Sequence, residues 1–248
     1  MIDIIFIYVQ ITILKKVKIL RLLLIFIFTL SFFYIYQSFS FVENMLYPPN
    51  STIENLTYEE WAIEFWKWWV NREDVKNIQN MNVDDKCFVY DKLPVLFLVN
   101  PFATQGSPEK KYECVISHNK PIFIVGVSEM CNINNVTKND DGLKTCVNER
   151  NQAARVLLTV DGEEREVIAK DKPPFRFTTD FFNITIPEKS FYADQGIGTN
   201  RALLDGIFFI LKPLPPGDHT VKYLTVQNFG PNHPWNAKLN VNYLFHVK

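Results

Sequence analysis

The sequence predicts a mainly β protein: a single antiparallel β-sandwich of jelly-roll type, with one Trp-rich amphipathic helix packed on it and an N-terminal membrane segment before it. Three observations support this fold class. A basic cluster stands directly before a long apolar run, one well-capped helix follows, and the remaining chain alternates apolar and polar residues with a period of two. We therefore divide the chain into a targeting and membrane segment (1–40), a linker (41–56) and one extracytoplasmic domain (57–248).

The membrane segment is predicted from the apolar run Leu22–Tyr36, which follows Lys15, Lys16, Lys18 and Arg21. Its length of about 15 residues lies between a signal-peptide core and a full bilayer span. Because the positive charges precede the run, the positive-inside rule keeps the N-terminus in the cytoplasm and the domain outside. We expect a single-pass anchor in the cell membrane. The alternative is secretion after cleavage of the signal near Ser40, where small residues occur.

A second apolar stretch, Ile2–Leu14, precedes the basic cluster. About 13 residues are too few to span a bilayer comfortably, and polar residues interrupt them. Two interpretations stay open. Either the stretch extends the anchor helix into the membrane surface, or translation begins downstream of Met1.

The four cysteines are typical of an oxidising compartment, because all lie beyond the membrane segment and none forms a C-x-x-C motif. Four cysteines allow three pairings, and proximity along the predicted strands favours Cys87–Cys114 and Cys131–Cys146. Their spacings are too wide for the ligand pairs of a zinc site. No two of the four histidines have a metal-ligand spacing either, so we expect no metal and no cofactor.

The composition and short motifs limit the classes of binding partner and indicate candidate modification sites. The formal net charge is −1, and no basic stripe occurs, so nucleic acid is not an expected partner. Four N-x-S/T sequons, which are candidate glycosylation sites, all lie in the part placed outside: Asn50, Asn55, Asn135 and Asn183.

The domain opens with a predicted helix over Tyr58–Val70, with Thr57 as N-cap and Glu60 completing a capping box. Its aromatic face is expected to dock on a sheet, with Trp61 and Trp69 in the core. Trp66 lies to the side of this face. We therefore expect its ring to stay partly exposed and take it as the candidate ligand-binding residue.

After the helix, nine segments are predicted as strands and turn residues separate them. No helical pattern lies between the strands, which argues against parallel βαβ units. The polar segment Asn132–Asn151 is expected to be a surface excursion closed by a disulfide. The predicted strands are Val95–Val99, Tyr112–Ser117, Ile122–Val127, Val156–Val160, Arg176–Thr179, Ile184–Ile186, Ile207–Leu211, Thr220–Val226 and Lys238–Val247.

Several short segments of the domain occur in an order that is similar to a known group of proteins. They are the Trp cluster of the helix, Cys87, the strand at Pro94–Leu98, Cys114 with Asn119-Lys120-Pro121, the Asp161-Gly162 turn, Asp205-Gly206, and the late segment Pro213–Thr220 (PLPPGDHT). This order resembles an uncharacterised group of secreted bacterial and archaeal proteins with a W-x-x-W-x-W-like helix and a late P-L-x-P-G-x-H-T segment. The chain departs from that group at Val99-Asn100-Pro101, where small residues and Gly are expected. The resemblance implies no particular activity or ligand.

Three carboxylates are weak candidates for acid–base catalysis: Glu129, Asp161 and Asp205. Turn chemistry explains Asp161, because Asp-Gly is a common hairpin signal. Asp205 interrupts an apolar run, so it needs solvent or a partner such as Arg176 or Arg201. His219, directly after a Pro-Pro-Gly turn, is expected to hydrogen-bond a neighbouring loop. No hydrolase, nucleotide-binding or metalloprotease motif occurs in the sequence.

These observations favour a membrane-anchored extracytoplasmic binding or envelope-structure module, with carbohydrate or another component of the cell envelope as its partner. The alternative is a secreted hydrolase that acts on glycans through acidic residues. Two carboxylates in one open cleft would favour the enzyme, whereas scattered carboxylates would favour the binding module.

Overall fold

A computed structural model describes residues 44–72, 89–90, 92–98, 109–134, 139–171, 173–234 and 236–248. The predicted membrane segment, the stretch Ile2–Leu14, Cys87 and the sequon at Asn135 lie outside these residues. Among the helices that the structure describes, none has the length and apolar character needed to cross a membrane.

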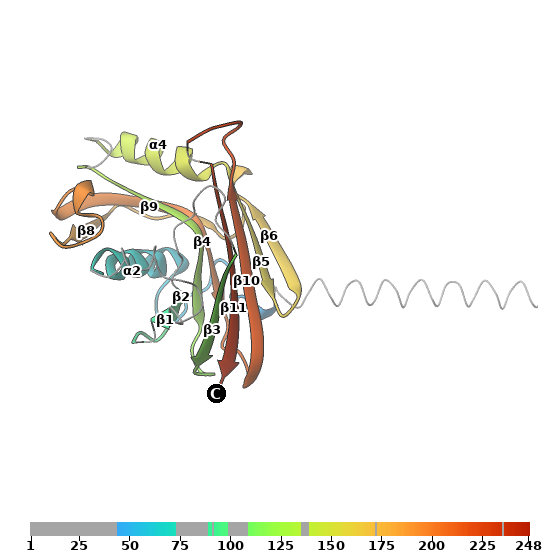
Figure 1. Cartoon of the computed structure of the whole chain (residues 1–248). Helices are drawn as coiled ribbons and strands as arrows, with labels where there is room; N and C mark the ends of the chain where they lie inside the picture. Colours follow the sequence, from blue (N-terminus) through green and yellow to red (C-terminus); the bar gives the residue numbers. More distant parts are fainter. Residues whose placement is uncertain are drawn as a thin grey trace, which may run out of the picture. The chain divides into compact units, whose positions relative to one another are not determined.

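The described chain is mainly β and contains two sheets (Figure 1). The eleven described strands are divided between these sheets, and the chain passes from one sheet to the other several times, so segments distant in sequence become neighbours. The six-stranded sheet has the order β1 (Val89–Tyr90), β2 (Leu96–Leu98), β4 (Ile122–Asn132), β9 (Gly198–Leu211), β7 (Arg176–Thr178), with β8 (Phe182–Ile186) also on β9. The five-stranded sheet has the order β3 (Lys110–Ile116), β11 (Ala237–Val247), β10 (Gly217–Gln227), β5 (Ala154–Val160), β6 (Glu163–Ile168).

Most strand pairs are antiparallel, but β2 pairs with β4 and β3 pairs with β11 in parallel. The expectation of a purely antiparallel fold is therefore wrong at these two pairs. Neither pair joins strands that follow each other directly in the chain: β3, in the other sheet, comes between β2 and β4, and several strands come between β3 and β11. A tight hairpin therefore does not fix their direction.

The two sheets touch face to face around Gly126 of β4, where a β-bulge falls between Val125 and Val127. The hydroxyl of Thr225 on β10 donates a hydrogen bond to the Gly126 carbonyl at 2.5 Å. A Cβ on Gly126 would lie 2.8 Å from a methyl group of Val156 on β5, which is too close for any larger residue. Glycine at the bulge therefore lets the sheets approach each other.

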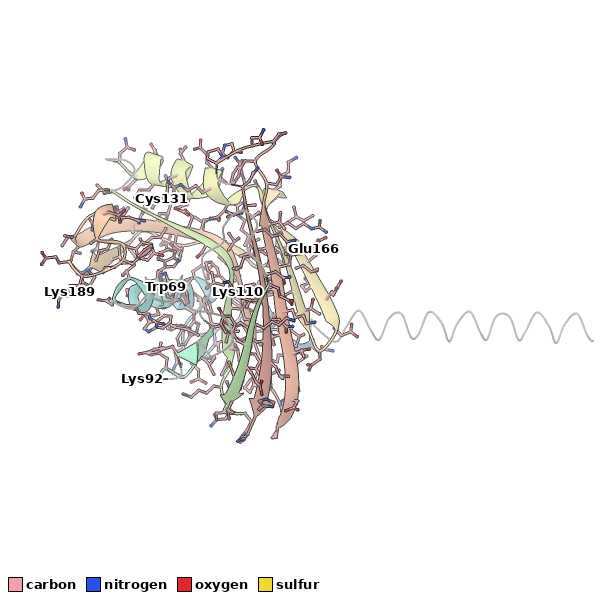
Figure 2. The ribbon with its side chains drawn as sticks, in the orientation of Figure 1. Trp69, Lys92, Lys110, Cys131, Glu166 and Lys189 are labelled. Carbon is pink, nitrogen blue, oxygen red and sulfur yellow. A yellow bond between two sulfur atoms is a disulfide. The ribbon has the colours of Figure 1, made fainter. Side chains whose placement is uncertain are left out.

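Helix α2 (Tyr58–Val70) has the predicted bounds and the predicted capping box. The Thr57 backbone N–H donates to the Glu60 carboxylate at 2.8 Å, and the Glu60 N–H donates to the Thr57 hydroxyl at 3.3 Å. The helix packs on β7, β8 and β9. Trp61 and Trp69 are buried, with exposed fractions of 2% and 4%, which confirms the docking of this face; Figure 2 shows where Trp69 lies on the helix.

The expectation that the Trp66 ring stays partly exposed is wrong. Its exposed fraction is 8%, its indole N–H donates to the Ser128 hydroxyl at 3.2 Å, and Tyr192 contacts its ring edge-on at 5.7 Å. The reason is that the segment after β8 packs along the side of α2, a long-range contact that helical periodicity does not reveal. Trp68 is the half-buried ring of the helix, and it packs on Tyr90 at a centroid distance of 4.8 Å.

The short strand β1 was not expected, and neither were two larger elements. Helix α4 (Asp140–Asn151) replaces most of the predicted surface excursion, and β6 forms an outer strand of the five-stranded sheet. The N-cap of α4 is Asn139, whose side-chain oxygen accepts the Gly142 N–H at 2.8 Å. Both elements are rich in charge, so neither has a clear apolar pattern.

Candidate functional site

Helix α4 is held on the six-stranded sheet by a small cluster of contacts. The disulfide Cys131–Cys146, which the sequence predicted, joins β4 to α4, and Figure 2 shows Cys131 beside this helix. Leu143 and Val147 of α4 pack with Leu203 of β9 in the same cluster. Cys114 is also disulfide-bonded, and its predicted partner Cys87 lies outside the described residues.

A row of polar residues crosses the sheet next to α4. Asp205 on β9 stands opposite Glu129 on β4 and opposite Thr178 on β7. Residues paired in this way on antiparallel strands have their side chains on the same face of the sheet. Two of the three candidate carboxylates, Glu129 and Asp205, are therefore neighbours.

Asp205 is 1% exposed, and both of its carboxylate oxygens accept hydrogen bonds from other residues of the protein. The Arg176 guanidinium donates to its Oδ1 at 3.0 Å, and the Thr178 hydroxyl donates to its Oδ2 at 2.6 Å. The Asn151 amide donates to its backbone carbonyl at 2.7 Å. The sequence-based expectation that Arg176 or Arg201 partners this acid is confirmed for Arg176.

Arg176 ties three parts of the site together. Besides Asp205, its guanidinium donates to the Ala169 carbonyl at 2.5 Å and to the Asn148 side-chain oxygen at 3.2 Å. Because Asn148 belongs to α4, the buried cation connects the helix with the sheet. A buried charge held by several hydrogen bonds keeps its surroundings in one arrangement.

Glu129 forms an ion pair with Arg150, the penultimate residue of α4. Burial raises the pKa of the Glu129 carboxyl, and the nearby Arg150 charge and hydrogen bond act in the opposite direction. Glu129 is thus a desolvated acid held by one arginine.

The third candidate, Asp161, lies in the other sheet at the turn between β5 and β6. Its backbone is in the left-handed region, with φ of 49°, as the hairpin prediction requires. Its carboxylate accepts the Thr220 N–H at 2.7 Å and lies 2.6 Å from Nδ1 of His219. Turn and loop contacts therefore account for both Asp161 and His219.

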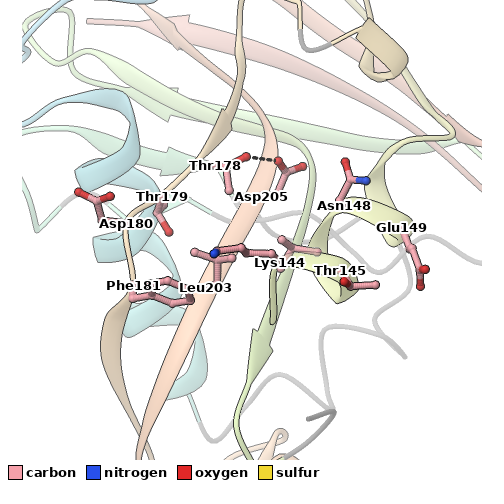
Figure 3. A pocket seen from close by; sticks show the side chains of 11 residues that line it. Lys144, Thr145, Asn148, Glu149, Thr178, Thr179, Asp180, Phe181, Leu203 and Asp205 are labelled. Atoms are coloured by element: carbon pink, nitrogen blue, oxygen red, sulfur yellow. Dashed lines mark hydrogen bonds between the residues drawn. The ribbon is translucent and has the colours of Figure 1, made fainter. Parts of the chain in front are cut away.

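A pocket of ≈ 620 Å³ lies between α4 and the connection from β7 to β8, and we refer to it as the α4 pocket. Figure 3 shows its side chains, with Asp205 and Thr178 joined by their hydrogen bond. The pocket is lined by Lys144, Thr145, Val147, Asn148, Glu149, Thr178, Thr179, Asp180, Phe181, Leu203 and Asp205.

The sequence did not point to the two exposed acids of this lining, Glu149 and Asp180. Within the part of the chain that the structure describes, neither carboxylate makes a hydrogen bond or ion pair. They come from different walls, since Glu149 is on α4 and Asp180 follows β7 (Figure 3). No motif marks them, because the fold alone brings these two segments together.

An aromatic ring contributes the apolar part of the α4 pocket. Phe181 is half-buried, with the Arg201 guanidinium 4.4 Å from its ring centroid and the Lys144 ammonium 5.9 Å away. Arg201 is itself fixed by two hydrogen bonds, of 2.9 and 3.0 Å, to the carboxylate of Asp140. Cation–π contacts with Arg201 of β9 and Lys144 of α4 therefore help to fix the position of the Phe181 ring.

The other predicted sites are scattered. Asn50, Asn55 and Asn183 are exposed, as glycosylation requires. Trp66 is enclosed and offers no free ring face for stacking. Among the described residues there is no group of His, Cys, Asp and Glu side chains arranged to hold a metal ion.

Comparisons with known proteins found a similarity among solved structures alone. No protein family matches it, and no curated protein matches it. Among solved structures, it is similar to the crystal structure of the cysteine protease inhibitor EhICP2 from Entamoeba histolytica, with 11% sequence identity and a TM-score of 0.20. That match covers 58% of this chain and 100% of the other.

Proposed function

We propose that this chain is a membrane-anchored extracytoplasmic binding module, whose α4 pocket holds a sugar of the cell envelope. One observation supports the proposal most strongly. The pocket combines the aromatic ring of Phe181, which Arg201 contacts, with the carboxylates of Glu149 and Asp180, which have no hydrogen-bond or ion-pair partner among the described residues. A concave site with an apolar surface and a few convergent polar groups is the usual form of a small-molecule site.

The chemistry of the lining fits a ligand rich in hydroxyl groups. The Glu149 and Asp180 carboxylates are acceptors. The Asn148 side-chain oxygen accepts a hydrogen bond from Arg176, and the NH₂ group of the same amide supplies donors for a ligand. The Phe181 ring supplies a flat surface against which the C–H face of a sugar can pack. Hydroxyl groups both donate and accept, so they match this mixture.

The three carboxylates proposed for catalysis favour the binding module over an enzyme. Glu129, Asp161 and Asp205 are each engaged by a cationic or hydrogen-bonding partner, namely Arg150, His219 and Arg176. A general acid must exchange its proton with a substrate, and a carboxylate that neutralises a buried arginine is poorly suited to this task.

The extracytoplasmic location rests on independent support. Cys131–Cys146 is a disulfide, and structural disulfides are typical of oxidising compartments. The basic cluster before Leu22–Tyr36 orients the domain outward by the positive-inside rule. We further infer that the two sheets form one jelly-roll-like sandwich, because the chain passes repeatedly between them and they touch around Gly126.

A glycan hydrolase is the second candidate, and one observation favours it. Glu149 and Asp180 approach the α4 pocket from two walls, as the acid and base of an inverting glycosidase do. In this case the catalytic acids would be these two residues and not the three that the sequence indicated.

One experiment separates the two functions. The full-length chain in mild detergent is titrated calorimetrically with soluble oligosaccharides of hexoses, amino sugars and uronic acids, and each mixture is then analysed for cleaved sugar. We expect one class to bind and to remain intact, and Phe181→Ala to weaken its binding by about tenfold, or ~1.4 kcal/mol. Glu188→Gln, which changes an exposed acid outside the pocket lining, is the control and should bind like the wild type.

Two outcomes contradict the proposal. Absence of binding across all three sugar classes removes the ligand assignment. Cleavage that is lost in Glu149→Gln or Asp180→Asn, but kept in Glu188→Gln, identifies a hydrolase.

A further inference from the structure

Two histidines at one end of the five-stranded sheet are held between acceptors. His246 on β11 lies 2.7 Å from Oδ1 of Asp218 through Nδ1, and 2.8 Å from Oε1 of Glu113 through Nε2. Asp218 belongs to β10 and Glu113 to β3, so the ring joins all three strands. An ionised carboxylate can only accept a hydrogen bond. Both ring nitrogens of His246 must therefore carry a proton, and the ring is an imidazolium.

His219 has the same kind of surroundings. Its Nδ1 lies 2.6 Å from Oδ2 of Asp161, and its Nε2 lies 3.0 Å from the carbonyl oxygen of Pro215. Both partners of this ring are oxygen acceptors in turns and loops. The contacts join the β5–β6 turn to the connection between β9 and β10.

His118 near the end of β3 provides a contrast. Its Nδ1 lies 2.9 Å from the Lys248 carbonyl, which is its single hydrogen-bond partner through the ring within the described residues. One N–H is enough for this contact. The remaining charged residues of β3, β5, β6, β10 and β11 are Lys110, Lys111, Arg155, Glu163, Glu164, Arg165, Glu166, Lys222 and Lys238, and Lys248 follows β11.

We propose that His246 forms a proton-operated latch that holds the strand β3 to β11 and β10 in the five-stranded sheet. Loss of one proton from the His246 ring removes a positive charge and one N–H donor, and so breaks one of its two contacts. Strand β3 is the element most affected, because it is at the end of the strand order and pairs with β11. The Glu113–His246 contact adds a side-chain tie to that pairing.

The direction of the pH effect follows from these contacts. Hydrogen bonds to Asp218 and then to Glu113 raise the pKa of His246 above its ordinary value. The folded protein therefore holds the proton more tightly than the unfolded chain does. This contribution to stability is fully present below the ordinary histidine pKa and is lost as the pH rises through the raised value.

Hydrogen–deuterium exchange of the full-length chain in detergent at about pH 6 and about pH 8.5, corrected for the intrinsic exchange rate, tests the latch. We expect protection of Lys110–Ile116 to fall by roughly threefold or more between these values, while α2 changes little. His246→Gln and Glu113→Gln should each remove most of this fall. His118→Gln is the matched control on the same sheet end and should keep it.

Equal protection of β3 at both pH values in the wild type overturns the proposal. The same holds if Glu113→Gln retains the wild-type fall. Glu113 is 72% exposed in its side chain, so this variant is expected to fold even if His246→Gln does not. The thermal midpoint of Glu113→Gln across the same range gives a second, independent measure.

Discussion

At the scale of single residues, the most consequential contact is the ion pair between Arg176 and Asp205, whose side chains are each 2% exposed. The sequence indicated that Asp205 needed a partner, because an acid inside an apolar run is costly without one. It could not indicate that Glu129 stands directly opposite, since that neighbour depends on the register of β4 and β9. The sequence also did not indicate Glu149 and Asp180, the carboxylates of the α4 pocket, because neither belongs to a recognisable motif.

The two neighbouring acids should respond differently to neutralisation. Asp205→Asn leaves the Arg176 charge buried without its partner and should cost about 3–5 kcal/mol. Glu129→Gln should cost much less, because the side chain of Arg150 is 34% exposed and can turn to water. Burial also raises the pKa of Glu129, so its ionisation costs stability as the pH rises and glutamine removes that cost. Urea unfolding at neutral pH measures both variants, and equal losses would contradict this account of the site.

At the scale of elements, the two helices show what a sequence reveals. Helix α2 was predicted to its end residues, because a capping box and an aromatic face lie close together in the sequence. Helix α4 was not, because only Leu143, Cys146, Val147 and Asn151 are buried in it and its other side chains are polar. Contacts with distant segments hold α4 in place, and among them is a covalent bond to β4.

The disulfide should stabilise the position of α4 against the sheet, and with it the wall of the α4 pocket that α4 forms. Replacing both Cys131 and Cys146 by Ser opens a link with a sequence separation of 15, which should cost about 3 kcal/mol. We expect faster hydrogen exchange throughout Asp140–Asn151, and little change in β10, which the disulfide does not touch. Unchanged protection of α4 in the double variant would show that its packing alone suffices.

At the scale of the whole molecule, the mainly β class and the docking of helix α2 follow from local patterns that the sequence carries. The two parallel pairs do not, because they depend on how the chain passes between sheets. Glycine at positions 126 and 206 is likewise a consequence of the packed fold: a Cβ on Gly206 would lie 2.6 Å from the Val127 carbonyl oxygen. Contacts between distant segments thus shape the site more than any local motif.

The proposed orientation of the molecule has its own test. A reporter that is active only outside the cytoplasm, fused after Lys248, should be active, because Lys15, Lys16, Lys18 and Arg21 hold the N-terminus inside. Replacing these four residues by Gln is the matched control and should reduce the signal. A reporter active only in the cytoplasm would contradict the extracytoplasmic assignment.

The central claim is that the α4 pocket is where a ligand binds, and filling it is the most direct measurement. Thr145→Trp places a large ring in the lining from α4, whereas Thr185→Trp makes the same change at an exposed position on β8 outside it. With the oligosaccharide that binds the wild type, calorimetric titration should show that Thr145→Trp loses binding by at least about tenfold and that Thr185→Trp keeps it. Equal affinity of the two variants would place the ligand elsewhere and contradict the account.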